Sequence, residues 1–304
     1  MKDLGEAAHI LGIKIYRDRS RRLIGLSQST YLDKVLKKFK MGQAKKGFLP
    51  MLQGVKLSQT QCPTPAEDIE KMKDVPYASA IGSIMYAMLC TRPDVCLDII
   101  LAGRYQSNPG VDHWTSGKNI LKYLKRTKDT FLVYGGDKEL VVNGYVDASF
   151  DTDPDDSKSQ TGYVFLLNDG AVSWCSSKQS VMAGSMCEVE CIAASEVANE
   201  GVWMKEFISD LGVIPSASGA MKIFCDNTGV IALAKESRFH KITKHIKRHF
   251  NFIHDQVKEG DIEIFKIHTD MNVADPLTKP LSRAKHDSTK TPWVLESLLC
   301  NLDY

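Results

Sequence analysis

The second half of the sequence predicts an α/β fold in which helices flank one mixed five-stranded sheet, and the first half predicts a mainly helical region before it. Three short runs of strand-forming residues, joined by turns, open the second half. Helical and strand-like segments then alternate, an order typical of helices packed on a sheet. The five predicted strands cover residues 141–146, 162–167, 171–176, 223–225 and 262–267.

Local signals justify the turns and helices of this half. Asp169-Gly170 lies between the second and third strands and is a two-residue hairpin signal. Apolar residues recur at helical spacing from about Met186 to Leu211, which predicts one long helix. A further helix is predicted over 242–258, and a last short helix begins near Asn272. Trp174 and Trp203 are expected in the core.

The first half has fewer strands and a helical apolar pattern. Its predicted elements are strands at 10–16 and 23–26, and helices from 27 or 29, over 77–90, over 93–105 and from 112. Ser27 or Ser29 can cap the first helix, since both carry a side-chain oxygen at its start. Residues 42–75 show no clear periodicity and predict an irregular connection.

Composition excludes several classes of protein. The 304 residues, 43% hydrophobic and 25% charged, match an ordinary globular protein of two domains. No apolar run reaches the ~18 residues of a membrane span, and the first residues lack a signal-peptide pattern. The eight cysteines form no C-x-x-C pair, so we expect reduced, buried thiols in an intracellular protein rather than zinc ligands.

Charge is distributed unevenly along the chain. Residues 1–49 contain twelve Lys and Arg against four acids, a local balance of +8, although the whole chain carries only +2. Such a block either binds a polyanion or forms a solvated face. Charge alone leaves both interpretations open.

Four acidic residues end or open elements that this topology would bring together. Asp147 ends the first strand, Glu190 lies in the first turns of the long helix, Asp226 follows the fourth strand, and Asp275 opens the last helix. Clustered carboxylates repel one another and need protons or metal ions to coexist. Oxygen ligands select Mg²⁺ or Mn²⁺, and two ions ~3.5–4 Å apart stabilise the attacking and leaving oxygens of displacement at phosphorus. Because acids at strand ends are common, spacing alone leaves a structural role open.

Ordered motifs run through almost the whole chain. The second half contains GYVDASF (144–150), TGYVFLL (161–167), AVSWCSSK (171–178), EVE (188–190), FCDN (224–227), TKHI (243–246) and VADPLTKP (273–280). The first half contains MKDLGEAAHILGIKI (1–15), LSQSTYLDKVLKKF (26–39), PYASAIGSIMYAMLCTRPD (76–94), SNPGVDHW (107–114) and ILKYLKRTKD (120–129). In this order they resemble the Pol polyprotein of copia-type LTR retrotransposons.

The resemblance implies a ribonuclease H-like fold and an endonuclease that cuts the RNA strand of RNA–DNA hybrids. It places the catalytic, metal-binding carboxylates at Asp147, Glu190, Asp226 and Asp275, with two Mg²⁺ or Mn²⁺ ions as cofactors. Glu188 shares the motif of Glu190, which is chosen because an apolar helical run follows it directly. Contacts to 2′-hydroxyls would distinguish RNA from DNA.

A basic segment beside this site is expected to contact the hybrid. Lys244, His245, Lys247 and Arg248 gather at one helix start, where they position phosphates or form a solvated face. Asn227 either contacts the substrate or caps the following helix.

The resemblance also implies a domain plan. Residues 1–137 are expected to be the end of a reverse transcriptase (palm end, thumb and connection), 138–282 the ribonuclease H domain and 283–304 a tail. The Tyr-Val-Asp-Asp palm motif of the family does not occur, so we expect no polymerase activity and a chain that lacks upstream polyprotein segments. Family analogy places the protein in the cytoplasm, in virus-like particles and off membranes.

Three positions depart from the family pattern. They are Ser149, Ser157-Lys158 and the run 186–191 (MCEVEC). The alternative function is therefore an inactive retrotransposon remnant that at most binds nucleic acid or a protein partner. An exonuclease of the same superfamily is a third interpretation, which the VADPLTKP motif disfavours.

Overall fold

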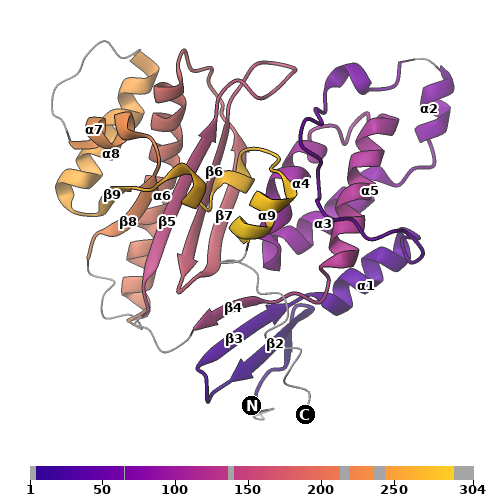
Figure 1. The fold of residues 1–304 in the computed structure, drawn as a ribbon, viewed down its shortest axis with the longest axis horizontal. Helices are drawn as coiled ribbons and strands as arrows, with labels where there is room; N and C mark the ends of the chain where they lie inside the picture. Colours follow the sequence, from indigo (N-terminus) through magenta and orange to yellow (C-terminus); the bar gives the residue numbers. More distant parts are fainter. Residues whose placement is uncertain (1–4, 65, 136–139, 213–218, 236–243, 291–304) are drawn as a thin grey trace. The chain divides into compact units, whose positions relative to one another are not determined.

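Two sheets organise the chain, one in each of two units (Figure 1). The first unit comprises residues 1–137 with 280–304, and the second comprises residues 138–279. The computed structural model describes residues 5–64, 66–135, 140–212, 219–235 and 244–290. Helices and a mixed five-stranded sheet occur together, which confirms the predicted α/β class.

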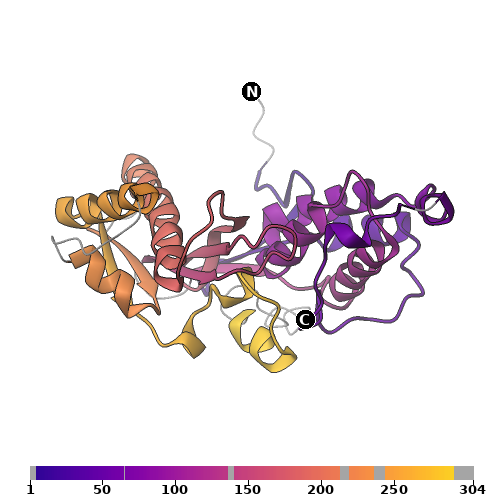
Figure 2. The ribbon, with the colours of Figure 1, turned by 90° about the horizontal axis from the view of Figure 1, so that it is seen from above.

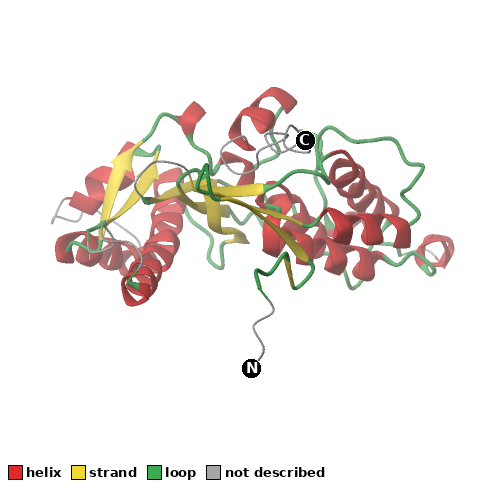
Figure 3. Ribbon diagram, turned by 90° about the horizontal axis from the view of Figure 1, so that it is seen from below, coloured by secondary structure: helices red, strands yellow, loops and turns green. Residues whose placement is uncertain are grey.

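The first unit combines helices with a four-stranded antiparallel sheet in the order β1-β2-β3-β4. Its strands are β1 (His9–Ile10), β2 (Ile13–Asp18), β3 (Leu23–Ser27) and β4 (Leu132–Gly135). Its helices are α1 (Ser29–Lys38), α2 (Ala66–Met72), α3 (Tyr77–Thr91), α4 (Cys96–Gly103), α5 (Val111–Arg126) and α9 (Arg283–Lys290), with 3₁₀ turns η1 (Gln59–Gln61) and η2 (Pro93–Val95). Figure 3 shows that helix predominates here, as the sequence predicts.

Local predictions for this unit need several corrections. The single strand expected over 10–16 is two strands, because Leu11 and Gly12 have φ of 47° and 79° and turn the chain between them. The residue that precedes α1 is Gln28, which makes no side-chain cap. Strand β4 was not predicted, and the connection over 42–75 contains η1 and α2.

A buried charged cluster lies among the helices of the first unit. Arg92 donates to both carboxylate oxygens of Asp94, at 2.8 and 2.7 Å, and the Tyr123 hydroxyl donates to the same carboxylate at 2.6 Å. Asp98 lies nearby and is only 6% exposed. Burial, opposed by its own backbone N–H and reinforced by Asp94, raises the pKa of Asp98 to about 7.

Helix α9, which lies within the expected tail over 283–304, belongs to the first unit. The ring of His286 meets Tyr123 edge-on, with centroids 5.6 Å apart. The Arg283 guanidinium lies 3.8 Å from the centroid of Phe48. Residues 291–304 of the expected tail lie outside the described residues.

The second unit is built on the sheet β7-β6-β5-β8-β9. Its strands are β5 (Val142–Ser149), β6 (Gln160–Leu167), β7 (Gly170–Lys178), β8 (Met221–Cys225) and β9 (Ile262–Lys266). Its helices are α6 (Met186–Leu211), α7 (Thr228–Lys235) and α8 (Lys244–Glu259), with 3₁₀ turns η4 (Thr269–Met271) and η5 (Asp275–Leu277). Strands β5, β6 and β7 are antiparallel neighbours, whereas β8 runs parallel to β5 and to β9.

Helix α6 anchors the core of this unit and packs against β5 and α8 (Figure 2). It begins after Ser185, whose side chain accepts from the Glu188 N–H, and ends before Gly212, whose φ of 63° suits a helix stop. The β6–β7 turn has Asn168 and Asp169 at φ of 46° and 70°, the left-handed pair of a tight hairpin. The predicted bounds of α6 and the existence of the hairpin are therefore confirmed, but the turn is Asn168-Asp169 rather than the predicted Asp169-Gly170, because Gly170 is already in β7 and pairs with Leu167.

Trp203 is not in the core, contrary to expectation. Its side chain is 55% exposed and stacks on Phe207 with ring centroids 5.4 Å apart. Both rings line a cavity of about 470 Å³ together with residues of β7, including Val172. Among the described residues, no helix is both long and apolar enough to cross a membrane.

Candidate metal centre

The centre begins at the carboxyl ends of two adjacent parallel strands. Tyr145 of β5 pairs with Phe224 of β8, so Asp147 and Asp226, each two residues further on, reach the same edge of the sheet. Asp147 is only 2% exposed, whereas Asp226 is partly exposed. The parallel pairing explains why residues far apart in the sequence meet here.

Helix α6 brings the third carboxylate to this edge. Glu190 is 5% exposed, and its Oε2 is buried without a hydrogen-bond partner among the described residues. Glu188 instead turns back to the helix start, where its Oε2 accepts from the Gly184 N–H at 2.7 Å. Of the two glutamates, only Glu190 is placed at the strand ends.

A loop tied to β5 supplies the fourth carboxylate. The Asn272 amide donates to the carbonyl of Val146 at 2.9 Å, and its Oδ1 accepts from the Ala274 N–H at 3.2 Å. This holds η5 beside Asp147 and leaves Asp275 fully buried. Gly162 of β6 allows the close approach, because a Cβ there would lie 2.7 Å from Leu277 Cβ.

Two neighbours of Asp275 complete the arrangement. The Thr278 hydroxyl donates to Asp147 Oδ2 and also lies 3.1 Å from the Asp275 carbonyl. Lys279 Nζ lies 2.7 Å from Asp275 Oδ1 and 3.9 Å from Asp147 Oδ2. Burial favours the neutral form of Lys279, but Asp147 and Asp275 raise its pKa above its usual value. The ammonium therefore offsets part of the negative charge.

The carboxyl groups of Asp147 and Glu190 still resist ionisation. Burial, reinforced by the charges of Asp275 and Asp226, raises the pKa of Asp147 to about 7 against the opposing effects of Lys279 and Thr278. Burial raises the pKa of Glu190 to about 9, with Asp147 and Asp226 adding repulsion. A group in this state gains stability from any cation that replaces its protons.

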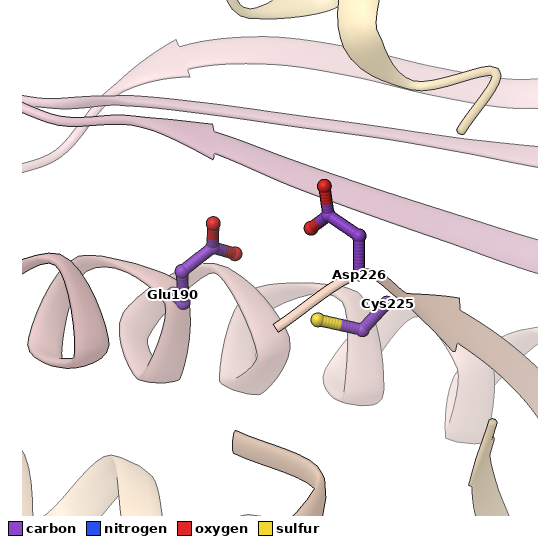
Figure 4. A group of neighbouring side chains, drawn as sticks. All are labelled: Glu190, Cys225 and Asp226. Carbon is purple, nitrogen blue, oxygen red and sulfur yellow. The ribbon is translucent and has the colours of Figure 1, made fainter. Parts of the chain in front are cut away.

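The residues present fit a divalent metal. Four carboxylates from β5, α6, the end of β8 and η5 supply the hard oxygen donors that Mg²⁺ and Mn²⁺ prefer. The unpartnered Oε2 of Glu190 is the kind of buried oxygen that an ion satisfies. Figure 4 shows Glu190 directed from α6 toward Asp226 at the end of β8.

The residues predicted to contact nucleic acid have three different placements. Asn227 caps α7, since its Oδ1 accepts from the Gly229 N–H at 2.8 Å and the Val230 N–H at 3.3 Å. Lys247 and Arg248 are exposed on α8. Lys244 and His245 begin that helix, and their side chains lie outside the described residues.

Comparison with known proteins identifies the chain. Retrovirus-related Pol polyprotein from transposon TNT 1-94 of Nicotiana tabacum is 42% identical over 290 residues, 95% of this chain and 22% of that protein. The Pol polyprotein from transposon RE2 of Arabidopsis thaliana is 32% identical over 286 residues, 93% of this chain and 19% of that protein. The chain belongs to the copia-type retrotransposon Pol family. It spans about a fifth of the length of these Pol relatives.

The copia-type assignment predicted from the motifs is thus confirmed, and the five-stranded mixed sheet agrees with the ribonuclease H-like fold expected for this part of Pol. No family model matches the chain. The solved structure of RNase H1 from the halophilic archaeon Halobacterium salinarum NRC-1 is 16% identical, covers 45% of this chain and 93% of that chain, and has a TM-score of 0.34.

Sequence reasoning missed four side chains of this copia-type centre: Cys225, Asn272, Thr278 and Lys279. The last three lie in or beside the VADPLTKP motif, which was a signal for their involvement. Their partners Val146 and Asp147 are 126 and 131 residues away, so the contacts themselves are not visible in the sequence. Cys225 carried the opposite signal, since it was interpreted as a core thiol.

Proposed function

We propose that the second unit is a ribonuclease H that hydrolyses the RNA strand of an RNA–DNA hybrid endonucleolytically. The observation that supports this most is the convergence of Asp147, Glu190, Asp226 and Asp275 at one sheet edge of a copia-type Pol chain. These four residues would hold two divalent ions, Mg²⁺ or Mn²⁺. Such ions, when bound, supply positive charge to the attacking and leaving oxygens of a displacement at phosphorus.

The chain's own residues prepare this site. Thr278 fixes the orientation of the Asp147 carboxylate by donating to Oδ2, and Asn272 holds the η5 loop against β5. Lys279 is 40% exposed at its side chain, so its ammonium can also face a phosphodiester. Rigid donors of this kind reduce the reorganisation required when charge develops in the transition state.

Substrate contact would extend over α8. The exposed Lys247 and Arg248 are suited to phosphates, which position a duplex without reading its sequence. Lys244, His245 and Asn227 remain predictions for the same role. Recognition of the RNA strand would require contacts to its 2′-hydroxyls across the minor groove.

The test compares two Asp-to-Asn variants of the full chain. Asp226→Asn removes a carboxylate of the centre, whereas Asp210→Asn removes an exposed one from the last turn of α6. We expect wild type and Asp210→Asn to cut only the RNA strand of a labelled hybrid in Mg²⁺ or Mn²⁺. Asp226→Asn should lose about 10²–10³-fold in rate, the usual cost of one electrostatic stabiliser.

Thermal unfolding gives an independent measurement. At an Mg²⁺ concentration 100 times its Kd, a one-site ion stabilises the folded state by about 2.7 kcal/mol. This gain should persist in Asp210→Asn and disappear in Asp226→Asn. If wild type neither cuts hybrid in either metal nor gains stability, the proposal is wrong and the inactive remnant is the better interpretation.

A further inference from the structure

The metal centre contains a thiol beside its carboxylates. Cys225 is the last residue of β8 and is fully buried. Its Sγ, a carboxylate oxygen of Glu190 and a carboxylate oxygen of Asp226 all lie within 4.8 Å of one another. Figure 4 shows the three side chains directed into one space between α6 and the end of β8.

A buried cysteine is usually a small core residue, and Cys225 does contribute to the core beside Ile223. Its sulfur, however, is close to the carboxylates of Glu190 and Asp226 as well as to apolar core side chains. One of them, Glu190, is 5% exposed and has an Oε2 without a hydrogen-bond partner among the described residues. A buried acceptor aimed at this space indicates a site that gains from a cation.

The donor set differs from that of a site built only from oxygens. Sulfur ligands favour thiophilic ions such as Zn²⁺ and Cd²⁺ over Mg²⁺. Zinc bonds of ~2.3 Å to sulfur and ~2.0–2.2 Å to oxygen place tetrahedral ligand atoms about 3.5 Å apart. The observed limit of 4.8 Å is within reach of that spacing by side-chain rotation.

We propose that Glu190, Cys225 and Asp226 form a three-ligand site for Zn²⁺ or another thiophilic divalent cation. As the metal–sulfur bond forms, the thiol S–H bond breaks and its proton passes to solvent, with no change in oxidation state. The fourth tetrahedral position stays open to water. Because Glu190 and Asp226 are shared, such an ion excludes Mg²⁺ from the carboxylates and inhibits hybrid cleavage, a consequence that rests on the proposed function.

Cadmium titration of the full chain tests the coordination directly. A cadmium–thiolate bond produces an ultraviolet charge-transfer band, which should saturate at one equivalent and be abolished by excess Zn²⁺. The band should be lost in Cys225→Ser, which keeps the side-chain size, and retained in Cys175→Ser, a matched change of a half-buried thiol in β7. Glu190→Gln should weaken the binding of Cd²⁺ by tenfold or more. Even the loss of a residue that only hydrogen-bonds to a metal ligand lowers metal affinity by about 10–100-fold.

The wild-type protein alone can overturn the proposal. The absence of the band in folded wild type would contradict it. A band of equal intensity in a folded Cys225→Ser would also contradict it, because cadmium would then be bound to another thiol. Circular dichroism melting confirms that each variant is folded.

The cleavage assay tests the proposed nuclease function separately from the cadmium band, which tests the thiol site. A Cys225-dependent band in a protein that never cuts hybrid supports the thiol site and contradicts the nuclease. Hybrid cleavage in Mg²⁺ without a Cys225-dependent band supports the nuclease and contradicts the thiol site. Where both hold, Zn²⁺ should inhibit wild type at concentrations at least about tenfold below those needed for Cys225→Ser.

Discussion

Replacing Gly162 by alanine is expected to damage the nuclease centre without touching a carboxylate. The new Cβ would lie 2.7 Å from Leu277 Cβ and 2.7 Å from Thr278 Cγ2, whereas ordinary contact begins at 3.4 Å. The η5 loop must therefore retreat by about 3.4 − 2.7 = 0.7 Å. A shift of this size lengthens the 2.6 Å hydrogen bond that Ser176 Oγ donates to the Leu277 carbonyl. It also moves the Thr278 hydroxyl away from the Asp147 carboxylate.

Two magnitudes follow for Gly162→Ala. Overpacking of this kind costs about 1–3 kcal/mol of unfolding free energy. A misplacement approaching ~1 Å in a catalytic group costs up to ~10²-fold in rate. Urea unfolding measures the first, and single-turnover cleavage of labelled hybrid by the full chain measures the second.

Gly201→Ala is the matched control for this experiment. It lies within α6, and its added Cβ would meet Met221 and Ile223 at 3.4 and 3.6 Å, which is ordinary contact. Because glycine weakens a helix interior, this variant should gain about 0.5–1 kcal/mol and cut hybrid normally. Wild-type stability and cleavage in Gly162→Ala would refute the idea that the η5 loop is seated by this contact.

Three further predictions concern other buried groups. Between about pH 4 and 7 the unfolded state binds fewer protons at Asp98 than the folded state does, so stability falls as pH rises, by up to about 4 kcal/mol. Asp98→Asn should remove this slope in urea unfolding, whereas Asp94→Asn should cost about 3–5 kcal/mol because it leaves Arg92 buried and unpaired. An unchanged slope in Asp98→Asn would show that Asp98 is not its source. Thr278→Val removes the hydroxyl that donates to Asp147 and should lower stability by about 1.5–3 kcal/mol together with the cleavage rate, so wild-type behaviour in both assays would contradict an orienting role.

Features with local causes were predictable from the sequence. Helix α6 matches its predicted bounds because Ser185 can cap its start and Gly212 can adopt the left-handed conformation at its end. The β6–β7 hairpin has a turn whose residues tolerate positive φ. The four acids came from motifs, and parallel pairing of β5 with β8 accounts for the meeting of two of them.

Features with tertiary causes were not predictable. Strand β4 is an exception, because the run Thr130–Tyr134 before Gly135 is rich in strand-forming residues and was overlooked; only its pairing partner Leu26, more than 100 residues from Leu132, is set by the tertiary fold. Trp203 was placed in the core because it is large and apolar, yet its position on α6 leaves it 55% exposed. Lys279 is one more surface-type residue in the sequence, and only the folded loop places it between two carboxylates.

The anchoring of η5 also has a consequence for the order of folding. Its bonds to Val146, Asp147 and Ser176 span 126, 131 and 101 residues, so they are among the most non-local contacts of the second unit. Contacts of this kind form slowly, because the loop entropy must be lost before the contact stabilises anything. We therefore expect β5, β6, β7 and α6 to assemble before the η5 loop docks. A partly folded chain would then hold Asp147 and Glu190, two of the four carboxylates, in place and still lack the segments that complete the centre.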